Sequence, residues 1–287
     1  MKSKRTWLIT GVSSGFGRAI SLAALENGDT VIGTVRSEAD KMAFEALGSG
    51  RATGKILDVR DDDAIRRVVA EAAEITGSID VLVNNAGYCL IGAIEEANLS
   101  EIRSQMEVNF FGAVAVLQAV LPYMRKKKSG SIFNITSVSG IASWAGIGYY
   151  CASKHALEAV GKTLAQEVAG LGIRVTNVAP GAFRTNFNKA HSLNYTQVEI
   201  DDYSYSSGLS RKLIADSAGK EAGNPALAAK AIMIVLEAKE APLHLLLGSD
   251  AIYYAGQQHS AFTAEVSNWM PVSINVNHDD SPYDRHE

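Results

Sequence analysis

Short apolar runs rich in β-branched residues alternate along this chain with longer segments in which apolar positions recur at helical spacing. Short runs bounded by turn residues predict strands, and the longer periodic segments predict helices. The first strands are expected at residues 6–10, 30–35, 55–59 and 79–83, with helices between them at residues 17–27, 39–47 and 61–76. Strict alternation of this kind is typical of βαβ units in a parallel sheet.

The alternation continues in the second half of the chain. We expect a helix ending at Lys128, a strand at 131–136, a helix near 150–170, a strand at 173–178, a helix at 225–238 and a strand at 243–247. The fold class is therefore α/β, a Rossmann-type doubly wound parallel sheet of about seven strands flanked by helices. No Pro/Gly/Ser linker and no fixed repeat interrupts the pattern, so we expect a single domain over residues 1–287.

Two segments depart from the alternation. A polar, tyrosine-bearing stretch at about 186–224 has no clear period. Long irregular segments inside compact domains are usually functional or disordered, so this stretch is expected to be a substrate lid. A carboxyl-terminal extension follows from about 250 to 287, and its end, from about residue 272, is expected to be peripheral and disordered.

Composition narrows the possible partners. The chain has 287 residues, 47% of them hydrophobic and 20% charged, which suits a packed core. Its net charge of −4 provides no polybasic surface, so neither nucleic acid nor an anionic membrane is an expected partner. The longest apolar stretch, residues 110–121, is shorter than the about 20 residues that span a bilayer, so no membrane span is expected.

Two cysteines and no recognisable secretory signal favour a reducing compartment, so we expect a cytoplasmic protein. The six histidines show no His-x-x-x-His spacing, and no metal site is predicted.

A glycine-rich loop follows the first predicted strand and opens the first helix. It contains Gly11, Ser13, Ser14, Gly15, Phe16 and Gly17. Pyrophosphate needs backbone N–H groups and a helix N-terminus at close range, and side chains at Gly11 and Gly15 would obstruct that approach. Gly17 would let helix and strand pack closely. This context favours dinucleotide binding over a simple glycine-rich turn.

Arg36 at the end of the second strand bears on the choice of cofactor. A carboxylate there would bind the ribose 2′-hydroxyl of NAD, whereas an arginine accommodates the 2′-phosphate of NADP. Arg36, together with Ser13 or Ser14, favours NADP over NAD. The alternative, in which Arg36 faces solvent and Glu38 or Asp40 binds the ribose, stays open.

Tyr150 and Lys154 stand four residues apart on a predicted helix and share one face. This spacing alone is common by chance. Ser137 closes a predicted buried strand, and Asn84-Asn85-Ala86-Gly87 follows another. Ligands of open parallel sheets bind at the carboxyl ends of the strands, where these segments converge.

With these residues the chain resembles the short-chain dehydrogenase/reductase family over about residues 5–250. The matching motifs are Thr10-x-x-x-Gly15-x-Gly17, Asp58-Val59, Asn84-Asn85-Ala86-Gly87, Asn109, Ser137, Tyr150-x-x-x-Lys154 and Pro180-Gly181. The resemblance implies a catalytic tetrad of Asn109, Ser137, Tyr150 and Lys154. The cofactor is expected to contact the glycine-rich loop, Arg36, Asp58, Val59, Asn85, Ala86, Gly87, Tyr150, Lys154, Pro180, Gly181, Phe183 and Thr185. Within the family, hydroxysteroid- and retinol-type dehydrogenases and their bacterial relatives look most similar.

The expected chemistry is hydride transfer between NADP(H) and a carbonyl or secondary alcohol. Tyr150 would act as general acid/base, because a nearby ammonium and an oxidised nicotinamide favour its phenolate. Ser137 would hold the substrate oxygen, Lys154 the nicotinamide ribose, and Asn109 a water leading to bulk solvent. Two alternatives remain open: an epimerase or dehydratase with a tightly held cofactor, and a dinucleotide-sensing protein without catalysis.

Residues near the predicted catalytic tetrad have other expected roles. Tyr149 lacks a lysine four residues on and is expected to line a pocket or an interface, and Cys151 has no partner that would make it a nucleophile. Aromatic and aliphatic residues predict a fairly large, apolar substrate: Tyr88, Leu90, Ile141, Trp144, Ile147, Phe183, Phe187, Tyr195, Tyr203 and Tyr205. The resemblance also implies a homodimer or homotetramer built on helices near 103–128 and 150–170.

Overall fold

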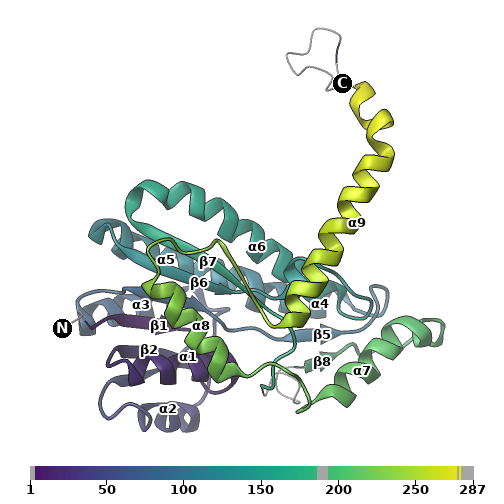
Figure 1. The fold of residues 1–287 in the computed structure, drawn as a ribbon. Coiled ribbons are helices and arrows are strands. Elements are labelled where there is room, and N and C mark those ends of the chain that lie inside the picture. The colour runs from purple at the N-terminus through teal and green to yellow at the C-terminus, as the bar shows by residue number, and fades with distance from the viewer. Residues whose placement is uncertain (1–3, 186–192, 277, 279–287) are drawn as a thin grey trace.

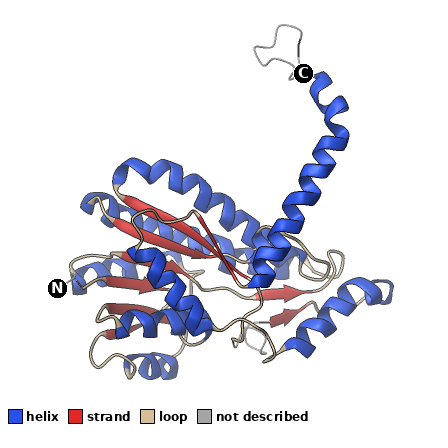
Figure 2. Cartoon of the chain, viewed as in Figure 1, coloured by secondary structure: helices blue, strands red, loops and turns tan. Residues whose placement is uncertain are grey.

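The computed structural model describes residues 4–185, 193–276 and 278. Its centre is a seven-stranded parallel sheet with the order β3-β2-β1-β4-β6-β7-β9. The strands are β1 (Thr6–Ile9), β2 (Thr30–Val35), β3 (Ala52–Ile56), β4 (Val81–Asn84), β6 (Gly130–Ile135), β7 (Ile173–Pro180) and β9 (His244–Leu247). The order steps outward in both directions from β1, which confirms the predicted Rossmann-type fold (Figures 1 and 2).

Helices cover both faces of the sheet. The α-helices of the described residues are α1 (Gly15–Glu26), α2 (Glu38–Glu45), α3 (Asp62–Thr76), α4 (Leu99–Met106), α5 (Gly112–Lys127), α6 (Gly148–Val168), α7 (Leu209–Ser217), α8 (Pro225–Glu237) and α9 (Ser249–Ser273), of which α7 and α9 lie away from the sheet (Figure 1). One apolar core contains Ile20 of α1 and Ile232 of α8, and a second contains Val68 of α3 and Val120 of α5. Burial of these two layers fixes the sheet between them.

The third strand was predicted three residues too far along the chain. Residues 55–59 were expected to form the third strand, but β3 ends at Ile56, whose partner in β2 is Val35. Leu57, Asp58 and Val59 therefore belong to the loop at the carboxyl end of the sheet, where ligands of this fold bind.

The segment at 186–224 is more regular than expected. Residues 186–192 lie outside the described part of the chain. Beyond them β8 (Leu193–Tyr195) pairs with β5 (Cys89–Ile91), and α7 follows after η5 (Asp201–Tyr203) and a π-helical turn, η6 (Ser204–Gly208). Short pieces of structure held by side-chain contacts leave no sequence period to read.

The carboxyl-terminal extension is also more ordered than its sequence suggested. α9 runs for 25 residues to Ser273, and the turn η7 (Ile274–Val276) extends it, so helix continues past residue 272. Figure 1 shows α9 rising away from the rest of the molecule.

One helix of the described residues is long and apolar enough to be a candidate membrane span. α4, a π-helical turn η1 (Glu107–Phe111) and α5 form a continuous helix, Leu99–Lys127, whose most apolar 18-residue window has a mean hydropathy of 1.3 and whose length would suffice to cross a membrane. Val116, Val120 and Met124 of this helix are buried in the core. Core helices of soluble proteins meet the same criterion, so this feature is weak evidence for a membrane partner.

Candidate active site

A cavity of about 770 Å³ follows the carboxyl ends of β1, β2, β4, β6 and β7. Of the residues predicted to form the site, all but Gly17 and Asn109 line it. The cavity also contains residues that the sequence did not point to, among them Arg60, Ile214, Asp250 and Tyr254. The last three lie far along the chain, and only the fold brings them here.

The glycine-rich loop has the backbone that close approach of a phosphate requires. Gly11 and Gly15 have φ angles of +72° and +57°, a region that other residues rarely adopt. α1 begins at Gly15, so its first N–H groups face the cavity. A Cβ on Gly17 would lie 2.3 Å from the Gly11 carbonyl oxygen, which makes Gly17 a packing residue between loop and helix.

Asn85 ties β4 to this loop. Its Nδ2 donates to the carbonyl oxygens of Thr10 and Gly11 at 2.8 and 2.9 Å. Thr10 Oγ1 accepts hydrogen bonds from the backbone N–H groups of Asn85 and Ala86. The Asn85 side chain thus holds the shape of the loop from the cavity wall, rather than pointing freely at a ribose.

Charged groups meet at the end of the cavity beside β2. Arg36 is exposed on the rim, while Arg60 binds the Asp58 carboxylate through Nε at 3.0 and 3.1 Å and Nη2 at 2.5 Å. This ion pair is the main cause of the lowered pKa of Asp58, and Arg36 adds to it. Glu38 and Asp40 do not line the cavity, which favours Arg36 over the open alternative.

Ser137 and Tyr150 lie together on the cavity wall. Tyr150 is only 8% exposed, and burial raises the pKa of its phenol, while a hydrogen bond with Ser137 opposes that rise. The lowering of this pKa expected from Lys154 and an oxidised nicotinamide concerns the protein with its cofactor bound. Among the protein's own groups burial outweighs the favourable contacts, so the phenol of the free protein holds its proton at neutral pH.

Lys154 is buried one turn beyond Tyr150. Its Nζ donates to the carbonyl oxygen of Ile135 at 2.8 Å and lies 5.8 Å from the centre of the Tyr150 ring. Burial lowers the pKa of Lys154 to about 8, and the charge of Glu158 acts in the opposite direction.

Glu158 is a buried carboxylate that no motif singled out. Thr136 Oγ1 donates to it at 2.6 Å and Asn177 Nδ2 at 2.8 Å, while His244 Nδ1 lies 3.3 Å away. Asn177 continues a row of paired amides through Asn134 across the sheet. Each partner satisfies part of the carboxylate, which is what permits its burial.

Asn109 sits in the π-helical turn η1, an irregularity often found at functional sites. Its Oδ1 accepts from the Tyr88 N–H, and its Nδ2 donates to the Tyr88 carbonyl and to Ser153 Oγ. These contacts hold the Asn109 side chain in place, and the predicted water relay stays a prediction. Asn109 fixes Tyr88 at the cavity.

Part of the cavity lining is apolar and aromatic. Of the residues expected there, Tyr88, Trp144, Ile147 and Phe183 line it, whereas Leu90, Ile141, Tyr195, Tyr203 and Tyr205 do not, and Phe187 lies outside the described residues. Trp144 meets Tyr254 of α9 edge to face, with ring centres 5.5 Å apart. The first turns of α9 therefore form part of the cavity wall, which no sequence pattern predicted.

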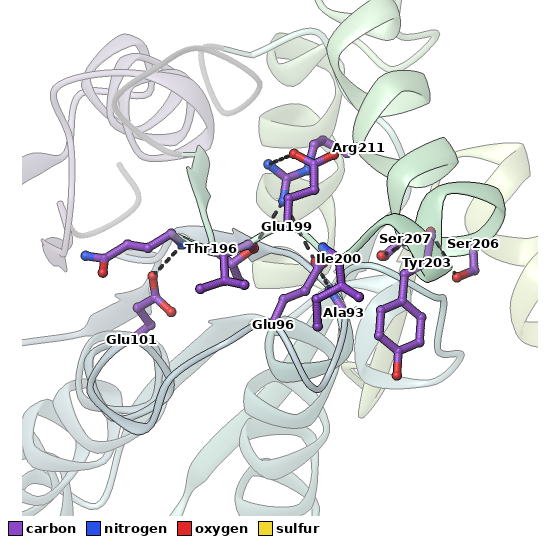
Figure 3. A network of polar contacts seen from close by, with 12 residues as sticks. Ala93, Glu96, Glu101, Thr196, Glu199, Ile200, Tyr203, Ser206, Ser207 and Arg211 are labelled. Atoms are coloured by element: carbon purple, nitrogen blue, oxygen red, sulfur yellow. Dashed lines mark hydrogen bonds and ion pairs between the residues drawn. The ribbon is translucent and has the colours of Figure 1, made fainter.

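Glu96 and Arg211 anchor the segment from β8 to α7 (Figure 3). Glu96 is 4% exposed and accepts hydrogen bonds from the N–H groups of Ala93 and Ile200 at 2.6 and 2.9 Å. Arg211 lies 3.9 Å from this carboxylate and 3.5 Å from that of Glu199. These contacts with buried Glu96 hold the segment that carries Leu193 and Ile214 to the cavity.

Other sequence candidates lie in structural roles. The Tyr149 hydroxyl donates to the Ile94 carbonyl, and Tyr149 does not line the cavity. Cys151 is buried and its thiol pKa is raised, mainly by burial. Within residues 4–185, 193–276 and 278 no cluster of His, Cys, Asp and Glu could hold a metal ion.

The short-chain dehydrogenase family model matches residues 5–196, two thirds of the chain. The chain belongs to this family. An oxidoreductase of the fungus Botryotinia fuckeliana is 37% identical over 94% of this chain and 98% of its own. A solved short-chain dehydrogenase from Streptomyces avermitilis is 41% identical with a TM-score of 0.91, covering 96% of this chain and all of its own. The structure of ElxO with NADP bound is 26% identical with a TM-score of 0.71, over 85% and 97% of the two chains.

The family resemblance noted in the sequence is therefore confirmed, and the protein is an oxidoreductase of that family. Such enzymes act on small molecules and many are oligomers.

Proposed function

We propose that this protein is an NADP-preferring carbonyl reductase or alcohol dehydrogenase in which Tyr150 transfers the proton. The observation that carries the proposal is the buried Ser137–Tyr150 pair on the wall of a cavity that the glycine-rich loop and Arg36 also line. The positive φ angles of Gly11 and Gly15 and the helix N-terminus at Gly15 fit a pyrophosphate. NADP binding by ElxO, a structural neighbour, supports the choice of cofactor.

Bound NADP(H) would supply or accept the hydride. The protein's own groups would then handle the oxygen of the substrate. Ser137 Oγ and the Tyr150 hydroxyl would both contact the carbonyl oxygen, which polarises it and fixes its position. As the oxygen gains negative charge, Tyr150 would donate its proton, giving the alcohol and leaving a phenolate.

Lys154 would stabilise that phenolate through its positive charge, 5.8 Å from the ring centre. In the oxidising direction the same steps run backwards and Tyr150 takes the proton from the alcohol. The protonated phenol of the free protein suits the reducing direction.

The substrate would be a bulky apolar or aromatic ketone or secondary alcohol. The apolar lining of the same cavity includes Trp144, Ile147, Ile214 and Tyr254. Such walls bind by apolar contact and shape, with the Ser137–Tyr150 pair as the polar anchor.

Consumption of NADPH in the presence of a panel of bulky ketones tests this function. Turnover with NADPH exceeding that with NADH is expected. Substrate conversion without net change in NADPH would replace it with an epimerase or dehydratase. Cofactor binding without any conversion across the panel would favour the dinucleotide sensor.

We also propose one domain over residues 1–287, a cytoplasmic location, and a homodimer or homotetramer formed through α5 and α6. Exposed apolar side chains on α5 and on the turn before it, Tyr123 and Phe111 of η1, support such a contact.

A further inference from the structure

The base of α9 is fixed to the cavity and the rest of the helix is not. Ala251 is fully buried, and the Asp250 carboxylate accepts a hydrogen bond from the Ala182 N–H at 2.6 Å. From residue 256 to residue 273 every residue is exposed. α9 thus leaves the body as an arm, as Figure 1 shows.

The face of α9 that packs on the body continues as an apolar stripe along the arm. It begins at buried Ala251 and half-buried Ala255 and, beyond the polar Gln258 and His259, resumes at Phe262, Val266 and Trp269. Phe262 and Trp269 are each 62% exposed. The spacing of these positions by three, four and seven residues is the pattern by which one helix packs along another.

An arm of this kind is not expected to stand alone in water. Isolated helices draw too little stability from their own hydrogen bonds, and most helices in proteins depend on packing of an apolar face. A row of exposed aromatic and aliphatic side chains marks a surface that another molecule covers.

The charge of residues 249–287 indicates which kind of surface covers the stripe. Residues 249–287 contain six Asp or Glu and one Lys or Arg, so this end of the chain is strongly acidic. Helices that bind anionic membranes carry Lys and Arg beside their apolar face, and this arm has none. The stripe itself carries no charge: Glu265, the one carboxylate of the arm, lies beside it.

We propose that α9 is a self-association arm, whose stripe packs against the α9 stripe of a second copy of this chain. An uncharged apolar stripe is self-complementary, as a two-fold contact between identical chains requires. At about 150–250 Å² for each aromatic side chain and an exposed fraction of 62%, Phe262 and Trp269 together offer about 190–310 Å² per arm. Standard interfaces use about 800 Å² per partner, so the pairing is expected to be reversible and concentration-dependent.

The proposal does not depend on the proposed oxidoreductase function or on a contact through α5 and α6. The paired arms belong to copies that α5 and α6 do not already join, so pairing through α9 doubles the assembly that those helices form. Its disruption would therefore halve the mass and leave NADPH binding in place.

Measuring the mass of the full-length protein in solution, over a concentration series, tests the arm. The double variant Phe262→Asp with Trp269→Asp places two charges in the stripe. The control Gln257→Asp with Ala264→Asp places two charges, also seven residues apart, on the opposite face of the same helix. The stripe variant is expected to show half the mass of the wild type, and the control an unchanged mass. Equal masses for all three proteins would overturn the proposal.

Cross-linking provides a second readout that does not depend on breaking the helix. Val266 is the stripe residue nearest the middle of the exposed part, so it meets its own copy whether the arms run parallel or antiparallel. Val266→Cys is expected to give a covalent dimer with a short bis-maleimide, and Ala264→Cys is not. The native Cys89 and Cys151 are buried and should not react. Equal yields from the two variants, or a monomer that binds neutral lipid vesicles through α9, would contradict pairing between copies.

Discussion

The carboxylate of Glu158 accepts a hydrogen bond at 2.6 Å from Oγ1 of Thr136, the residue that precedes Ser137 in the chain. Glu158 also lies one helical turn beyond Lys154 on α6, on the same face. It therefore places a buried negative charge behind the lysine that faces Tyr150. The pKa of Lys154, lowered to about 8 by burial, would fall further without it.

Glu158→Gln tests this coupling through the pH profile. Loss of the negative charge removes a cause that raises the pKa of Lys154, so the lysine would lose its proton at lower pH. The alkaline limb of kcat for ketone reduction is expected to move down by about one pH unit. Glu167→Gln makes the same change at an exposed position of α6 and should leave the profile in place. A purely structural role for Glu158 would lower the unfolding temperature without moving the limb.

Arg36→Asp tests the choice of cofactor. An aspartate on the rim would repel the 2′-phosphate of NADP and accept a hydrogen bond from the ribose 2′-hydroxyl of NAD. The ratio of NADP to NAD affinity is expected to fall by about tenfold or more, which corresponds to about 1.4 kcal/mol. Arg67→Asp, on the exposed face of α3, is the matched control. An unchanged ratio in Arg36→Asp would remove this arginine from phosphate binding.

Glu96→Ala tests the anchor of the β8–α7 segment. The substitution leaves the N–H groups of Ala93 and Ile200 without their acceptor, at a cost of about 1–3 kcal/mol for each buried group left unpaired. We expect faster proteolysis between residues 193 and 217 and a higher KM with little change in kcat. Glu74→Ala on α3 serves as the control. Unchanged proteolysis and KM would show that Glu96 does not hold the segment.

The sequence predicted the sheet well because inner strands such as β1 and β4 are apolar runs buried on both faces, a local signal. It misplaced the end of β3, since Leu57 and Val59 are apolar and buried but lie in the loop. The side chains of those two residues pack against the core from outside the strand.

The parts of the site that come from distant segments left no local signal. Tyr254 reaches the cavity only because α9 starts beside Gly181, and Glu158 acts through Thr136 and Asn177 rather than through a motif. Asn109 was predicted from the family resemblance, but its hydrogen bonds to Tyr88 follow from the π-helical turn.

The central claim, that Tyr150 transfers the proton, is tested most directly by comparing Tyr150→Phe with Tyr149→Phe. Both variants lose one phenolic hydroxyl from adjacent positions of α6, but only Tyr150 lies on the cavity wall. The measurement is single-turnover oxidation of NADPH by a bulky ketone, with NADPH affinity determined alongside. We expect the rate of Tyr150→Phe to fall by about 100- to 10,000-fold with NADPH affinity nearly unchanged, and the rate of Tyr149→Phe to stay close to wild type. A Tyr150→Phe variant that oxidises NADPH at the wild-type rate would contradict the account.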